Sequence, residues 1–419
     1  MMKEMATMGE SDERAPIALA LAGGGPLGAM YEVGALVALA DTLDGIDFNE
    51  LDIYVGVSVG SLISAGLVNG VSPEKIFHIF AGNDPSEVSV DPELFMPLAV
   101  GEFLKRARTV PKLLALSMID FARSPFRRGF FASFHRLTKA IPAGVFSNAG
   151  IVNFVERLLS GEGRTNNFRR LTRKLFIVAT DLDSGESVAF GGYNRDHVAI
   201  SKAVSASAAL PGLYPPVEID GRSYVDGALK KTLHASVALK EGAKLVICIN
   251  PLVPFNAVRA ALMGNPKKHK LVEEGLPAVL SQTFRAIIHS RMKTGLSKYE
   301  IEYRDADVIL FEPSSDDADI FFTNVFSYRN RRQLVDHAFR KTREDLRARY
   351  DVLAPKLASH GVSINRRILD DPHRTLARAV GGLNRHSRRP IGQAALHLSD
   401  TLDSLAKLIR KIELRQKAV

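Results

Sequence analysis

The sequence predicts an α/β fold with a largely parallel central sheet, and three observations carry this prediction. Short apolar runs alternate with helical patterns between residues 17 and 312. Two of these runs lead directly into glycine-rich turns, "GGGPLG" and "GVSVG". The pattern beyond residue 312 is helical only. Strands that alternate with helices form a parallel sheet, so we expect one α/β domain over residues 16–312 and a basic helical extension over residues 313–419.

Composition is that of an ordinary globular protein. The chain has 419 residues, of which 46% are hydrophobic and 24% charged. Its single cysteine, Cys248, lies in the apolar run "KLVICINP", which excludes a disulfide framework and argues against a cysteine metal site. The net charge of +9 indicates an anionic partner, such as nucleic acid, an acidic substrate or an anionic membrane surface.

The N-terminal residues 1–15 are expected to be a flexible segment. They lack the basic and apolar regions of a secretory signal, which favours a cytoplasmic location. Residues 53–73 carry no charge and are long enough to resemble a transmembrane helix. Glycines and turn residues interrupt this stretch, so a buried strand followed by a helix explains it better. We therefore expect neither a signal peptide nor a transmembrane helix.

The first strand, residues 17–22, runs into "GGGPLG", and a helix with Pro26 in its first turn follows. Gly23, Gly25 and Gly28 match the dinucleotide-binding fingerprint. That function needs an acidic residue at the end of the second strand, and none is there. The alternative is an oxyanion hole, in which glycine N–H groups at a helix N-terminus stabilise a developing negative charge.

The second strand, residues 53–57, leads into Gly56-Val-Ser58-Val-Gly60, which fits the nucleophile elbow of serine hydrolases. In this turn strand and helix approach so closely that a Cβ atom at either glycine would clash. The motif alone is short enough to arise by chance in an ordinary tight turn. A glycine-rich loop of donors beside a candidate nucleophile makes acyl transfer the leading hypothesis.

The remaining elements follow the same alternation. A helix–strand series leads to a hairpin with its turn at Asp220-Gly221, and buried strands follow it. The expected helices lie within residues 70–82, 151–159 and 201–209, and the expected strands at 174–180, 245–250 and 307–311. Residues 91–142 form an apolar and basic helical insertion. No strand is predicted after residue 312.

A nucleophilic serine needs a base, and two candidates stand out. Among the eleven histidines, His234 is the least implausible, although a helical position without a catalytic role explains it better. Asp226, in "SYVDGAL", ends a short apolar strand and is followed by Gly227. The alternative for Asp226 is a plain turn, since Asp-Gly is common in turns.

Three blocks in order, "GGGPLG", "GVSVG" and "DGA" at residues 226–228, resemble the patatin-like phospholipases. The resemblance covers about residues 16–312 and implies a three-layer α/β/α fold. It implies a dyad of Ser58 as nucleophile and Asp226 as base, without a histidine. Gly23, Gly24, Gly25 and Gly28 would form the oxyanion hole. No metal or cofactor is implied.

One position departs from this family. Many members carry Arg or Lys where the chain has Leu27, which affects how the loop is anchored and how an anionic head group is held, but leaves the backbone donors in place.

We expect a phospholipase A or lysophospholipase type enzyme that cleaves acyl esters of lipids. The alternatives are a catalytically weak or silent lipid-binding scaffold with this fold, and a nucleotide-binding protein. Nucleic acid is not expected as a partner.

Within the insertion, residues 103–139 contain nine Lys or Arg residues against one acid, Asp120, among many Phe and Leu residues. One interpretation is a helical cap with buried aromatic side chains and solvated charges. The other is peripheral contact with an anionic membrane surface.

Overall fold

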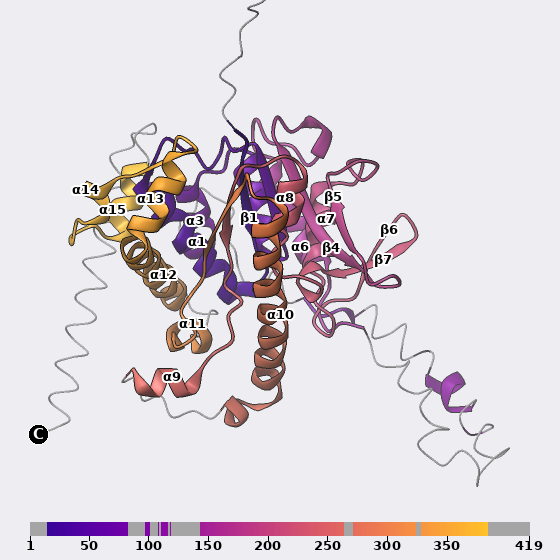
Figure 1. The fold of residues 1–419 in the computed structure, drawn as a ribbon. Coiled ribbons are helices and arrows are strands. Elements are labelled where there is room, and N and C mark those ends of the chain that lie inside the picture. The colour runs from indigo at the N-terminus through magenta and orange to yellow at the C-terminus, as the bar shows by residue number, and fades with distance from the viewer. Residues whose placement is uncertain are drawn as a thin grey trace, which may run out of the picture.

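A computed structural model shows a twisted, mostly parallel sheet covered by helices on both faces (Figure 1). The hydrogen-bonded path of the sheet is β6-β7-β4-β3-β1-β8-β9, and β5 pairs with β4. The structure describes residues 15–82, 97–100, 108, 110–115, 118, 143–263, 271–323 and 328–383.

The central strands of the sheet are parallel, as the sequence predicts. Pairs β1·β3, β1·β8, β3·β4 and β8·β9 are parallel, whereas β5, β6 and β7 form antiparallel pairs at one side. The hairpin turn at Asp220-Gly221 has φ values of 52° and 74°, the left-handed conformation expected there. The strands are β1 Ile17–Leu21, β3 Ile53–Val57, β4 Lys174–Asp181, β5 Ser187–Phe190, β6 Val217–Ile219, β7 Arg222–Asp226, β8 Leu245–Ile249 and β9 Asp307–Phe311.

Alternating side chains of β1 enter two hydrophobic cores, one on each face of the sheet. Leu19 and Leu21 belong to the larger core, and Ala18 and Ala20 to the smaller one. This confirms the three-layer α/β/α fold. The larger core contains α1 Gly25–Thr42, α2 Val59–Val68, α3 Pro73–Ala81, α6 Ala149–Leu159, α7 Ile200–Ser207 and α12 Tyr328–Ala348. The smaller core contains α8 Ala235–Lys240 and α10 Gly275–Glu302.

Helix α12 packs along α1, so the helical C-terminal region shares the larger core. Gly34 of α1 makes this approach possible, because a Cβ atom there would lie 2.5 Å from the carbonyl oxygen of Val335. Helix α1 is therefore buried between the sheet and α12, and burial raises the pKa of its Glu32 well above the ordinary value.

The remaining elements complete the C-terminal half. The expectation of no strand beyond residue 312 is wrong, since β10 Ser363–Ile364 pairs antiparallel with β2 Leu43–Asp44. A two-residue strand has no periodicity that a sequence pattern could reveal. The other elements are 3₁₀ helices η3 Phe168–Arg170, η4 Gly227–Leu229 and η5 Leu271–Glu274, and α9 Ala257–Leu262, α11 Ala318–Phe322, α13 Tyr350–Ala358, α14 Arg366–Leu369 and α15 Leu376–Leu383.

Two of the predicted segments fall largely outside the described residues. These are the N-terminal segment and the basic insertion, including most of residues 103–139. Over the described ranges, no helix combines the length and the apolar character needed to cross a membrane.

Candidate active site

Ser58 occupies the sharp turn between β3 and α2. Its backbone has φ 51° and ψ −123°, a conformation that non-glycine residues rarely adopt. The two flanking glycines have the steric role predicted for them. A Cβ atom on Gly56 would lie 2.4 Å from the Cα of Ser61, and one on Gly60 would lie 2.4 Å from the carbonyl oxygen of Ala22. The strained turn thus presents the Ser58 side chain at the carboxyl end of β3.

A second serine holds the backbone of this turn. The N–H of Ser58 donates to the Ser207 hydroxyl at 2.8 Å, and that hydroxyl donates to the carbonyl of Val178 at 2.6 Å. Ser207 is fully buried at the end of α7. Sequence reasoning missed Ser207, because nothing in "SASAAL" distinguishes a structural serine from helix filler.

The strand register brings Asp226 to Ser58. Val57 lies opposite Val178 on β4, and the next residue of β4, Ala179, lies opposite Asp226 on β7. The Asp226 carboxylate therefore lies beside the Ser58 hydroxyl, which acts to lower the pKa of the carboxyl group. The N–H of Ala228 donates to the same carboxylate at 2.8 Å.

Gly227 lets the chain turn tightly after Asp226. A Cβ atom at this position would lie 2.2 Å from the carbonyl oxygen of Val178. The packing of β7 on β4 thus requires a glycine at position 227. The turn also leads into η4, and Asp226 caps the start of η4 by accepting the hydrogen bond from Ala228.

Burial makes Asp226 a weaker acid. The residue is 4% exposed, and desolvation raises its pKa to about 6, against the lowering effect of the hydrogen bonds from Ala228 and Ser58. At neutral pH the carboxyl group is ionised yet more basic than an exposed aspartate. This is the state that a general base requires.

The glycine loop lies against the serine. A Cβ atom on Gly23 would be 3.1 Å from the Cβ of Ser58 and equally close to that of Ala228. Gly25 has φ +58°, which favours glycine, and begins α1. Among the described contacts, the N–H groups of Gly23, Gly24 and Gly25 donate to no other residue. They lie at the N-terminus of α1, the end of a helix that favours a negative charge, and Gly23 is next to Ser58.

Residues after β8 pack against this glycine loop. Cβ atoms on Gly24 and Gly28 would lie 2.8 and 2.9 Å from the Pro251 ring. The buried Arg285 of α10 donates to the carbonyl oxygens of Pro251 and Val253, each at 3.4 Å. Sequence reasoning missed both Pro251 and Arg285, which lie more than two hundred residues beyond the loop.

The comparison with known families agrees with this geometry. The model of the family described as patatin-like phospholipase matches residues 19–239, just over half of the chain. The chain belongs to the patatin-like phospholipase family. Members of this family are lipid hydrolases, and the match includes Ser58 and Asp226 together with the glycine loop.

Individual relatives of this patatin-like chain are distant. A protein of Acanthamoeba polyphaga mimivirus is 26% identical over 223 residues, which cover 53% of the chain and 60% of that protein. An NTE family protein of Mycobacterium tuberculosis is 33% identical over 110 residues, 26% of the chain and 18% of that protein. The chain thus spans less than two thirds of the length of each of these relatives.

Solved structures show similarity at low identity. The chain is similar to VipD from Legionella pneumophila, with 15% identity, a TM-score of 0.33 and coverage of 78% of this chain and 67% of that chain. It is also similar to ExoU in complex with SpcU from Pseudomonas aeruginosa, with 15% identity, a TM-score of 0.28 and coverage of 90% and 72%.

The position of His234 differs from that of a catalytic base. The residue is 3% exposed, and burial lowers its pKa to about 4, so the imidazole is neutral. Its Nε2 atom has no hydrogen-bond partner among the described residues, and no hydrogen bond among them joins the imidazole to Ser58 or Asp226. Leu27, where many patatin-like proteins carry a cation, packs against the larger core.

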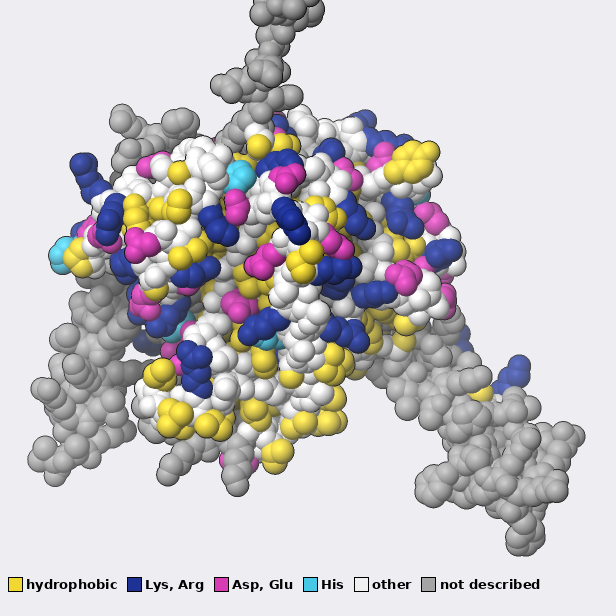
Figure 2. All heavy atoms as spheres, viewed as in Figure 1, with side chains coloured by type: hydrophobic (Ala, Val, Ile, Leu, Met, Phe, Trp, Pro, Cys, Tyr) yellow, Lys and Arg dark blue, Asp and Glu magenta, His cyan; other side chains and the backbone are white. Residues whose placement is uncertain are grey.

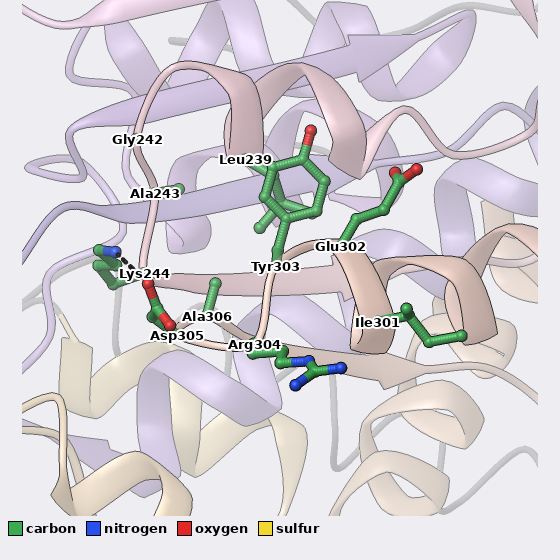
Figure 3. Close-up of a pocket in the computed structure, with 10 residues that line it drawn as sticks. All are labelled: Leu239, Gly242, Ala243, Lys244, Ile301, Glu302, Tyr303, Arg304, Asp305 and Ala306. Carbon is green, nitrogen blue, oxygen red and sulfur yellow. Dashed lines mark ion pairs between the residues drawn. The ribbon is translucent and has the colours of Figure 1, made fainter.

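Two other clusters lie apart from the serine. The pocket in Figure 3 is at the amino ends of β8 and β9, where Lys244 pairs with Asp305 at 3.7 Å, so it is at the sheet edge opposite Ser58. The structure also brings together Asp317, Asp319 and His337, which the sequence did not group. The His337 Nε2 atom is hydrogen-bonded to Asp317 at 2.6 Å, and this contact accounts for the cluster.

Proposed function

We propose that this patatin-like chain is a serine hydrolase of lipid acyl esters, of the phospholipase A or lysophospholipase type, which uses Ser58 as nucleophile and Asp226 as base. The observation that carries the proposal is the position of the strained Ser58 beside the buried carboxylate of Asp226, whose pKa is raised to about 6. A solvated turn aspartate would have neither the partner nor the shift.

The proposed reaction needs only groups that the site provides. As the Ser58 oxygen attacks the ester carbonyl carbon, its proton passes to the Asp226 carboxylate. The negative charge that develops on the carbonyl oxygen is stabilised by N–H groups of Gly23, Gly24 and Gly25 at the start of α1. Collapse of the tetrahedral intermediate breaks the ester bond, and the proton from Asp226 leaves with the alcohol. Water, deprotonated by Asp226, then releases the fatty acid from the acylated serine.

Hydrolysis by single and double variants tests the dyad. Ser58→Ala and Asp226→Asn should each reduce kcat on a soluble short-chain ester by a factor of about 10³ or more, because each removes one partner of a single proton transfer. The kcat of the double variant should be nearly equal to that of the less active single variant, because both residues act in the same proton transfer. His234→Ala is the matched control, a buried ionisable residue close in sequence, and should retain activity.

Two results would contradict the proposal. Full activity of Asp226→Asn with loss of activity in His234→Ala would make the histidine the base. Wild-type chain that hydrolyses neither a soluble ester nor a phospholipid would favour the silent scaffold.

A further inference from the structure

Exposed apolar side chains gather on one end of the molecule, over α9, η5 and the first half of α10. Figure 2 shows this patch at the end of α10 that projects beyond the body of the protein in Figure 1. The most exposed member, Leu262, has 82% of its surface accessible. The patch consists of Val258, Leu262, Met263, Val272, Leu276, Leu280, Phe284 and Ile287.

On α10 the patch is a regular stripe. Leu276, Leu280, Phe284 and Ile287 follow one another at intervals of four, four and three residues, so they share one face of the helix. The next position on this face is Arg291, followed two residues later by Lys293. The stripe is therefore apolar at its outer end and cationic about 22 Å further along the helix axis.

Within α10 the charges beside the stripe have one sign, although two acids stand before the start of the helix. No Asp or Glu occurs between residues 275 and 299, and Glu273 and Glu274 precede the helix. Arg291 and Lys293 are exposed and form no ion pair with any residue in the described ranges. A helix with an apolar end and unpaired cations further along its axis can insert the apolar end between the headgroups of an anionic bilayer. The cations then contact the lipid phosphates.

The patch is joined to the candidate active site. Helix α9 follows β8 through residues 250–256, and Pro251 of this link packs on Gly24 and Gly28. Gln282 of α10 clamps the same link, accepting from the Phe255 N–H at 3.0 Å and donating to its carbonyl at 2.7 Å. Phe321 of α11 packs on the Phe255 ring. The patch is thus fixed to the edge of the sheet that carries Ser58.

We infer that the α9–α10 patch docks the protein on an anionic phospholipid bilayer. The choice of a bilayer as the occupant rests on the proposed function, because the substrate of that reaction lies in a lipid surface. Leu276, Phe284 and their neighbours enter the headgroup boundary, and Arg291 and Lys293 contact phosphate groups. Docking brings the glycine loop and Ser58 to the membrane.

Vesicle binding of the full chain tests this inference. Leu276→Glu with Phe284→Glu should weaken sedimentation with vesicles of phosphatidylcholine and phosphatidylserine by a factor of about ten or more. Hydrolysis of a soluble short-chain ester should change by less than about twofold, because neither residue touches the site. The matched control is Ile301→Glu on the same helix, since Ile301 is 68% exposed and Leu276 is 69% exposed, but Ile301 lies beyond the cations.

A charge-reversal variant tests the cationic end. Arg291→Glu with Lys293→Glu should weaken binding to the phosphatidylserine vesicles and leave the weaker binding to pure phosphatidylcholine vesicles nearly unchanged. Added salt should reduce the difference between the two vesicle types.

Three outcomes separate the possibilities. Vesicle binding that neither variant changes would overturn the inference. A double apolar variant that sediments as a smaller species than wild type, with unchanged vesicle binding, would show an interface between copies of the chain and also overturn it. If the wild type hydrolyses no ester but loses vesicle binding in the variants, the docking surface stands and the proposed function fails.

Discussion

The ionisation of Asp226 sets the pH range in which Ser58 can be activated. Burial raises the pKa of this carboxyl group to about 6. Only its ionised form accepts the serine proton, so activity is lost as the pH falls through the pKa. We expect kcat/KM on a soluble ester to be constant above about pH 7 and to fall about tenfold per pH unit below pH 6.

A pH profile of kcat/KM measures this directly. Ellipticity recorded over the same pH range is the control that separates titration of the base from unfolding. A limb near pH 4 would show that Asp226 behaves as an exposed carboxylate, and a limb that persists in Asp226→Asn would belong to another group.

Leu27 and the glycines beside it affect different parts of the site. A backbone N–H is present whichever side chain follows it, so Leu27 leaves the donors of Gly23 to Gly25 intact. Its side chain packs on the core and adds to the anchoring of α1. The buried Arg285 contacts the backbone of Pro251, and the Pro251 ring packs on the same loop. In this chain the glycine loop is thus supported by packing from the residues after β8 and from α10.

Among the helices, α1 depends on a close approach to α12 that one glycine permits. Gly34→Ala should destabilise the protein by about 1–3 kcal/mol, because the new methyl group would lie 2.5 Å from the Val335 carbonyl oxygen. Gly381→Ala is the matched control, since a Cβ atom on Gly381 meets nothing within 4 Å. This control should be neutral or stabilise the protein by up to about 1 kcal/mol, as alanine favours helix.

Urea unfolding of the two variants measures the difference in the free energy of unfolding. Equal stability of Gly34→Ala and wild type would mean that α12 is not held against α1 in solution.

Most strands of the central sheet were predictable from sequence, whereas β2, β5 and β10 and the longest helix were not. Strands β1, β3 and β9 follow from short apolar runs, and the turns around Ser58 and Asp220 follow from glycines that sterics requires. Helix α10 lacks the usual pattern of apolar and polar faces, because it exposes leucines and a phenylalanine on the α9–α10 patch. An amphipathic helix is recognised by one apolar face and one polar face. An exposed apolar stripe removes this contrast between the two faces.

Only the residues of the candidate site that belong to local sequence motifs could be predicted. Ser58, Asp226 and the glycine loop are marked by local motifs, with glycines where the backbone is strained or crowded. Ser207 and Pro251 are not marked, because their importance comes from contacts with residues far away in the chain. The hydrogen bond between Ser58 and Ser207 joins positions 149 residues apart. Such contacts are set by the strand order of the sheet, which no local pattern reveals.

In the whole molecule, the groups of the candidate active site lie together at the carboxyl ends of the central parallel strands. β1 ends at the glycine loop, β3 at Ser58 and β8 at the link to α9, while β7 brings Asp226 to the same edge. The N-terminus of α1 points its dipole at this edge, and the α9–α10 patch extends from it (Figure 1). Helices as far as α15 share the larger core with α1, so we propose that the folded catalytic unit reaches residue 383.

The central claim is that Ser58 is a nucleophile activated by Asp226. A fluorophosphonate probe tests it most directly, because the probe reacts with an activated serine through the same attack and proton transfer. Mass spectrometry of peptides from the labelled full chain should place the adduct on Ser58, with labelling lost in Ser58→Ala, strongly slowed in Asp226→Asn and accelerated as the pH rises through about 6. An adduct on another serine, or labelling of Ser58 at the wild-type rate in Asp226→Asn, would contradict the account.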